Sequence, residues 1–212
     1  MKLSKNEEIA RLILGDDIVF PDEIAEVRGL YYTDAQLKYF ADTMTSEEAL
    51  RWCKANGYAI VAGPPSPMGL LEVRSLKPEY FPLYPKSSRC YEGCSFSNDD
   101  KAQTEWLAIR KDPVPKSFHQ NWNEQLLRLL PDEQVPNAGE MSWFITTFYE
   151  VRGVQLFEEV YVRTSSVSSV GYHVAVGYFD KDRGGLDIID CRDASRYCCT
   201  SGLAASRKFP KA

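Results

Sequence analysis

The sequence contains few of the residues and motifs that identify a reaction. It has two histidines among 212 residues, which leaves little material for a histidine-based metal site or general base. The phosphate-binding patterns Gly-x-x-x-x-Gly-Lys-[Ser/Thr] and Gly-x-Gly-x-x-Gly are absent, and no nucleophile stands in a glycine-flanked elbow. The sequence therefore predicts no cofactor, and an enzyme is the less favoured interpretation.

An excess of positive charge and long apolar runs are also missing. The net charge of -5 and the pI near 5.2 argue against a protein that binds by neutralising phosphates, so nucleic acid is a disfavoured partner. The first eleven residues place charges where a signal peptide needs an unbroken apolar stretch, and the apolar runs elsewhere are too short to cross a bilayer. We therefore expect a cytoplasmic protein without a membrane anchor, whose cysteines are mainly free thiols.

What is present is ordinary globular composition, with 44% hydrophobic and 12% aromatic residues. Proline at a helix start and glycine after its end are typical boundaries, so Pro21 and Gly29 predict a helix. Thr33 or Asp34 predicts the capped start of a third helix, and Thr45 or Ser46 predicts that of a fourth. Residues 1–63 are thus expected to form a helical N-terminal region.

Residues 64–212 are expected to form an α+β body that makes one compact unit with that region. Asn137, with Glu140 three residues later, predicts the capped start of a central helix that Gly153 ends. Three predicted strands follow at 156–164, 172–179 and 186–191, and short loops between them favour an antiparallel meander. Because helices precede strands without regular alternation, we predict an α+β fold whose central helix packs on an antiparallel sheet ending in this three-stranded meander.

One short string occurs twice. Glu-Val-Arg-Gly stands at 26–29 and again at 150–153. Both copies lie where a helix is expected to end, so we interpret them as the same end signal used twice and not as a duplicated domain.

Alternate residues of a strand face opposite sides of a sheet, which assigns the two faces of the meander. The even-numbered residues are apolar and are expected to face the central helix: Val160, Val162, Val174, Val176, Leu186 and Ile188. The odd-numbered face then carries Tyr161, Arg163, His173, Phe179, Ile189, Cys191 and Asp193.

A polar row is predicted on the odd-numbered face. If the hairpins turn at 166–170 and 182–184, Arg163 lies opposite His173, and His173 lies opposite Asp193. A second turn moved by one residue would set Ser195 opposite His173 and keep the same faces. We take Arg163, His173, Asp193, Tyr161 and Cys191 as the candidate polar site, although a solvated face with incidental charge pairs is the favoured interpretation of the pattern.

Other polar residues give weaker signals. Cys90 and Cys94 have a spacing that zinc could use, but zinc needs two further ligands. The candidates are His119 or the adjacent cysteines at 198–199, and adjacent cysteines chelate one ion poorly. We therefore predict no metal site. Acidic pairs such as the one at 16–17 are expected to be solvated carboxylates.

The leading functional interpretation is a non-enzymatic binding or interaction protein. It would bind a protein or small-molecule partner through a surface of the C-terminal sheet, or through a groove between that sheet and the N-terminal helices. The alternative is a hydrolase-like enzyme that uses His173 with Cys191 or Asp193. The sequence does not fix the oligomeric state.

Several segments are similar to a group of uncharacterised bacterial proteins of unknown function. They are the segments 21–30, 106–111, 135–138 and 205–208, and most distinctively 151–166. The resemblance covers most of the chain from about Phe20 onward. It implies a bacterial origin and an association with prophages or mobile elements, and it carries no activity or site residue.

Overall fold

The computed structural model describes residues 4–81, 91–180, 184–191 and 201–209, and its helices and strands form an α+β fold, as predicted. The helices are α1 (Lys5–Leu14), α2 (Pro21–Arg28), α3 (Asp34–Asp42), α4 (Glu47–Ala55), α5 (Leu70–Leu76), α6 (Phe96–Asp99), α7 (Trp122–Leu126) and α8 (Ala138–Arg152), with short 3-10 helices η1 (Gly15–Asp17) and η2 (Pro78–Tyr80). The strands are β1 (Ile18–Val19), β2 (Tyr58–Ala62), β3 (Trp106–Arg110), β4 (Glu133–Gln134), β5 (Tyr161–Val167), β6 (His173–Asp180), β7 (Gly185–Cys191), β8 (Gly202–Leu203) and β9 (Ser206–Arg207).

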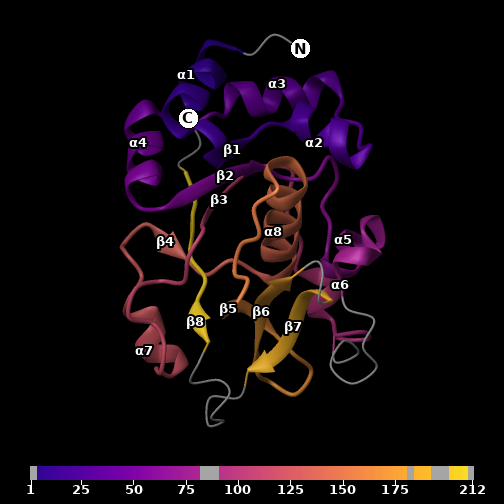
Figure 1. Ribbon diagram of the computed structural model, residues 1–212, viewed down its shortest axis with the longest axis vertical. Helices are drawn as coiled ribbons and strands as arrows, with labels where there is room; N and C mark the ends of the chain where they lie inside the picture. Colours follow the sequence, from indigo (N-terminus) through magenta and orange to yellow (C-terminus); the bar gives the residue numbers. More distant parts are fainter. Residues whose placement is uncertain (1–3, 82–90, 181–183, 192–200, 210–212) are drawn as a thin grey trace.

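The strands form two sheets. The first has the order β1-β2-β3-β9-β4, and the second has the order β7-β6-β5-β8. β1 pairs in parallel with β2, and β8 pairs in parallel with β5, whereas the other pairs are antiparallel. The short segment 202–207 adds β8 to the second sheet and β9 to the first. The N-terminal helices lie at one end of the molecule and the meander β5–β7 at the other, with α8 between them (Figure 1).

The predicted helix boundaries are confirmed in the N-terminal region. α2 begins at Pro21 and ends before Gly29, whose φ of 63° is the left-handed conformation that glycine adopts easily. The side chains of Thr33 and Ser46 accept hydrogen bonds from backbone N–H groups in the first turns of α3 and α4. β2 of this region pairs with β3, so strands from both sides of residue 63 share the first sheet.

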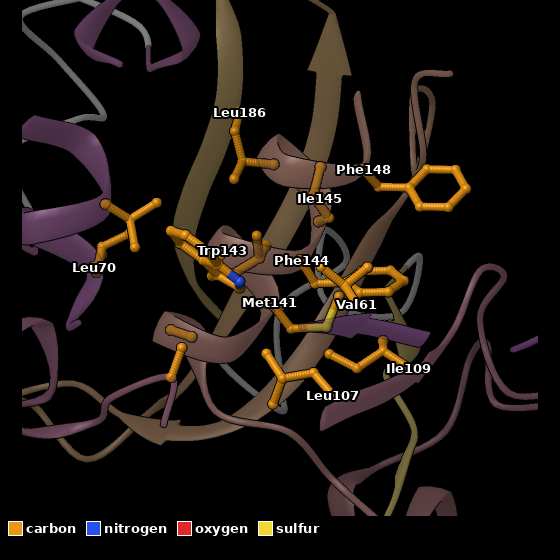
Figure 2. Close-up of a cluster of buried hydrophobic side chains, with 14 of the residues drawn as sticks. Val61, Leu70, Leu107, Ile109, Met141, Trp143, Phe144, Ile145, Phe148 and Leu186 are labelled. Atoms are coloured by element: carbon orange, nitrogen blue, oxygen red, sulfur yellow. The ribbon is translucent and has the colours of Figure 1, made fainter. Parts of the chain in front are cut away.

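α8 is the predicted central helix. Asn137 and Glu140 form its capping box, and Gly153 ends it with a φ of 69°. Every residue from 138 to 148 is buried, because both sheets and the helices α2 and α5 pack around the helix. In Figure 2, Phe144 lies beside Val61 of the first sheet, and Ile145 and Leu186 of the meander belong to the same buried cluster.

The predicted inner face of the meander is confirmed. Val162, Val174, Val176, Leu186 and Ile188 are buried in the main core. β5 begins later than predicted, at Tyr161, because the chain at Phe157 has a φ of 56° and is not yet extended.

The assignment of Phe179 to the outer face was wrong. Phe179 is fully buried and packs edge-on against Tyr80 and Tyr149 in the core. The pairing of β6 with β7 shifts between Gly177 and Asp180, and Tyr178 has a φ of 48° at this bulge. An extra residue in a strand reverses the face on which the following side chains lie.

Candidate functional site

Arg163, the first residue of the predicted polar row, is buried and not solvated. Only 1% of it is exposed. Its Nε donates to the Sγ of Cys191 at 3.0 Å, and its Nη1 donates to the Oε1 of Gln125 at 3.2 Å. The predicted pairing of Arg163 with His173 is wrong, because Arg163 lies opposite Ala175 and the register shifts before Val167 pairs with His173.

His173 lies opposite Cys191 across β6 and β7, where the sequence predicted Asp193. The observed register differs from the predicted one by two residues, which keeps the same side chains on each face. Asp193 lies outside the described residues. The imidazole of His173 stacks on the indole of Trp122, with ring centroids 3.5 Å apart and planes tilted by 17°.

α7 and the segment around it cover this end of the sheet. The Nε2 of Gln125 donates to the carbonyl oxygens of Ser117 at 2.7 Å and Ser201 at 2.9 Å. The Sγ of Cys191 lies 3.8 Å from the hydroxyl of Ser201. Arg163, Gln125 and Cys191 are thus all buried, and we call Arg163, His173, Cys191, Trp122 and Gln125 the Arg163 cluster.

Tyr161 belongs to a different environment on the same face. Its hydroxyl donates to the Oδ2 of Asp187 at 2.5 Å, and its ring lies 4.5 Å from that of Tyr178 between centroids. Burial raises the pKa of Tyr161, and the hydrogen bond to Asp187 raises it further. The structure therefore brings Arg163, His173 and Cys191 into one group and leaves Tyr161 beside it, toward the half-exposed Tyr178.

A pocket that the sequence did not predict lies at the C-terminal end of α8. Its volume is about 340 Å³, and its lining residues are Asp16, Asp17, Lys111, Asp112, Phe148, Arg152, Val154 and Leu156. These residues come from η1, from the segment after β3, and from the end of α8 with the chain that leads to β5. We call this cavity the α8 pocket.

Arg152 ties α8 to the N-terminal wall of the α8 pocket. Its Nε donates to the carbonyl oxygen of Asp16 at 2.9 Å, its Nη2 donates to the carbonyl oxygen of Ile18, and its Nη1 pairs with Glu23 at 2.8 Å. Burial alone would raise the pKa of Glu23, but the hydrogen bonds from Arg152 and the Phe20 N–H, with the charges of Arg152 and Arg11, hold it below its ordinary value.

A second set of ion pairs joins η1 to α4 and to the segment after β3. The carboxylate of Asp17 forms ion pairs with the Nζ of Lys111 at 2.5 Å and with the Nζ of Lys54 at 2.9 Å. The backbone N–H of Lys111 also donates to the carbonyl oxygen of Gly57 at 2.9 Å. Asp17 is therefore not the freely solvated carboxylate that the sequence predicted, since two ammonium groups hold it in place.

Two further properties concern the residues that the structure describes. Among them, no three or more His, Cys, Asp or Glu side chains are grouped as they would be around a metal ion. Cys90 and the adjacent cysteines at 198–199 lie outside the described residues, and His119 is exposed. No described helix combines the length and apolar character of a membrane span.

The α8 pocket had only a weak signal in the sequence. The second Glu-Val-Arg-Gly string contains Arg152, and it was interpreted as an end signal alone. The pair Asp16 and Asp17 was visible, but nothing in the sequence indicated that it meets Lys111 and Phe148. Comparison with known proteins adds nothing to this geometry, because no protein-family model, curated protein or solved structure matches the chain.

Proposed function

We propose that this protein is a non-enzymatic binding protein that takes a small molecule in the α8 pocket. The observation that carries the proposal is a cavity of about 340 Å³ in which apolar and charged side chains converge. Ligand sites are concave, mostly apolar, and contain a few placed polar groups, and this volume is near the lower end of their usual range. The cavity lies between η1, the segment after β3 and the end of α8 with the chain that leads to β5, whereas the groove expected from the sequence lay between the C-terminal sheet and the N-terminal helices.

The walls of the α8 pocket are held before any ligand arrives. Arg152 makes bonds from Nε, Nη1 and Nη2 to the wall formed by η1, β1 and α2. Phe148 and Leu156, which are 3% and 7% exposed, are packed into the core behind the cavity. A site whose side chains are already fixed loses little conformational entropy on binding, which favours a small ligand.

The test is a fragment screen followed by amide NMR. Binding in the α8 pocket should shift the amide signals of Asp17, Asp112 and Val154 for at least one compact apolar fragment. Val154→Trp should abolish those shifts, because Val154 is 48% exposed on the pocket wall and an indole there would fill the cavity.

The matched control is Val170→Trp. Val170 is 62% exposed between β5 and β6 and does not line the pocket. This variant should bind the same fragments as the wild type. The proposal is wrong if no fragment perturbs the pocket amides, or if Val154→Trp leaves binding unchanged.

A second candidate function is a hydrolase-like enzyme built on the Arg163 cluster. The observation that favours it is the register that sets Cys191 opposite His173, with the guanidinium of Arg163 bonded to the sulfur. A hydrogen bond from a cation favours the thiolate form, which is the nucleophile in cysteine chemistry. We place this candidate second because Cys191 is only 2% exposed.

The thiol of Cys191 can be followed by the Cβ signal of ¹³C-labelled cysteine during a pH titration. Cys53 is an internal reference, because burial raises its pKa to about 12 against the opposing charge of Arg207. The enzyme candidate predicts that Cys191 ionises at lower pH than Cys53, and that Arg163→Met moves this transition to higher pH. Identical titrations of Cys191 in a folded Arg163→Met variant and the wild type would remove the candidate.

A further inference from the structure

We infer that the α8 pocket takes an organic cation, consisting of an ammonium group attached to a compact apolar body. This inference rests on the proposed function and adds the chemical class of the ligand. It follows from a comparison of the hydrogen-bond donors and acceptors that line the cavity.

The positive groups of the pocket are already engaged. Lys111 binds Asp17 at 2.5 Å, and Lys54, which does not line the cavity, binds the other oxygen of the same carboxylate at 2.9 Å. Arg152 donates from Nε, Nη1 and Nη2 to two backbone carbonyls and Glu23, and 11% of its side chain is exposed. These cations already pair with groups of the protein that form the pocket walls. They therefore have few free donors for an anionic ligand.

Two carboxylates on the pocket wall can still accept hydrogen bonds from a ligand. Asp16 and Asp112 both line the cavity and are exposed. Neither carboxylate has an ion pair or a side-chain hydrogen bond to another residue within 4–81, 91–180, 184–191 and 201–209. An isolated exposed carboxylate is ordinary, but here two of them border one cavity whose inner wall contains Phe148 and Leu156. An ammonium group has only donors and a carboxylate has only acceptors, so carboxylates beside an apolar wall suit an ammonium group attached to an apolar body.

The end of α8 adds to the same preference. The helix has 15 residues and ends at Arg152, at the edge of the cavity. The C-terminus of a helix carries a partial negative charge, which favours a nearby cation. The carboxylates and the helix end therefore favour a cation over a neutral or anionic molecule of the same size, and the apolar wall favours an apolar body attached to that cation.

The test uses three probes of similar shape and different charge, namely 2-phenylethylamine, 2-phenylethanol and 3-phenylpropanoate. Each is titrated into ¹⁵N-labelled protein at pH 7 and low salt, with the amides of Asp17, Asp112 and Val154 as reporters. The amine should bind tighter than the alcohol by about two- to fivefold for each carboxylate, the range of a partly exposed ion pair. Added salt should reduce this preference because it screens exposed charges.

Variants of Asp16 and Asp112 test whether these two carboxylates cause the preference for the amine. Asp16→Asn combined with Asp112→Asn should make the amine and the alcohol bind equally. Asp99→Asn is the matched control, because Asp99 is also exposed but lies on α6, away from the cavity. It should leave the preference intact.

The outcomes separate the two proposals. If the amine has no advantage over the other probes, or if the anion binds best, the cation inference is wrong, whereas binding at the pocket amides still supports the small-molecule function. If no probe and no screened fragment perturbs these amides, the proposed function itself fails. If Asp99→Asn abolishes the preference as well, the effect comes from net charge and not from the two carboxylates.

Discussion

The buried ion pair between Arg28 and Glu150 offers the sharpest test of how α2 is joined to α8. The Arg28 side chain is 0% exposed and the Glu150 side chain is 4% exposed, and they come from the two copies of Glu-Val-Arg-Gly. Burial lowers the pKa of Arg28, while the nearby charge of Glu150 opposes that shift. Arg28 stays charged at neutral pH, since an arginine pKa lies far above that range.

The cost of Arg28→Met follows from the contacts that it removes. The Nη2 of Arg28 donates to the hydroxyl of Thr146 at 2.8 Å, and its guanidinium lies 4.7 Å from the ring centre of Trp143. Among the described residues, Glu150 would keep its ion pair with Lys77 at 2.7 Å, and the Lys77 side chain is 27% exposed. Removing one partner of a buried pair typically costs about 3–5 kcal/mol, and the remaining lysine places our expectation at the lower end of that range.

Urea denaturation followed by circular dichroism measures this change in the free energy of unfolding. Arg51→Met is the matched control, because Arg51 pairs with Glu47 on the surface of α4, where both side chains are more than half exposed. An exposed pair of this kind should contribute less than about 0.5 kcal/mol. Arg28→Met combined with Glu150→Leu should recover stability, since no buried charge remains unpaired. A loss below about 1 kcal/mol for Arg28→Met alone would refute the argument.

Three further predictions concern the core, pH and metal content. Phe144→Ala and Phe148→Ala should each cost about 3–5 kcal/mol in denaturant melts, because both rings are buried, and losses below about 1 kcal/mol would contradict their placement. The lowered pKa of Glu23 means that its stabilisation is present above the ordinary value of 4.5 and is lost as the pH falls below it. Glu23→Gln should therefore destabilise the protein at pH 7, and this effect should shrink in the same melts as the pH falls below 4.5. Elemental analysis of protein purified without added zinc should find no stoichiometric transition metal, and about one zinc per chain, lost when Cys90 and Cys94 become Ser, would overturn this.

The sequence predicted best those features that neighbouring residues determine. Helix boundaries at Pro21, Gly29, Asn137 and Gly153 depend on local backbone conformation and on hydrogen bonds within one turn. The inner face of the meander depends only on alternation along each strand. Both kinds of feature were predictable because the residues that cause them lie within a few positions of each other.

Strand register was not predictable in the same way. Moving a hairpin by two residues keeps every side chain on its face, so the apolar pattern could not distinguish Cys191 from Asp193 as the residue opposite His173. The bulge requires Tyr178 to adopt a left-handed backbone conformation. Tyrosine rarely adopts that conformation, so nothing in the sequence indicates a bulge at this position. Phe179 was therefore assigned to the wrong face.

The α8 pocket was beyond prediction for another reason. Its walls come from segments near residues 16, 111 and 152, and they meet only because β2 pairs with both β1 and β3 while α8 packs across the sheet. The burial of Arg163 has a similar origin. Gln125 of α7 reaches it across 38 positions of sequence, and alternation within one strand contains no information about a covering helix.

The two Glu-Val-Arg-Gly strings connect stability and the proposed site in one place. The glutamate of the second string binds the arginine of the first, which joins α8 to α2. The arginine of the second string, Arg152, fixes the backbone of Asp16 and Ile18 at the pocket wall. The end of α8 thus supports the fold on one side and the cavity on the other. Because Arg152 bonds to backbone carbonyls there, the wall should keep its shape when Asp16 is replaced, so the carboxylate variants change the charge of the site and leave its form intact.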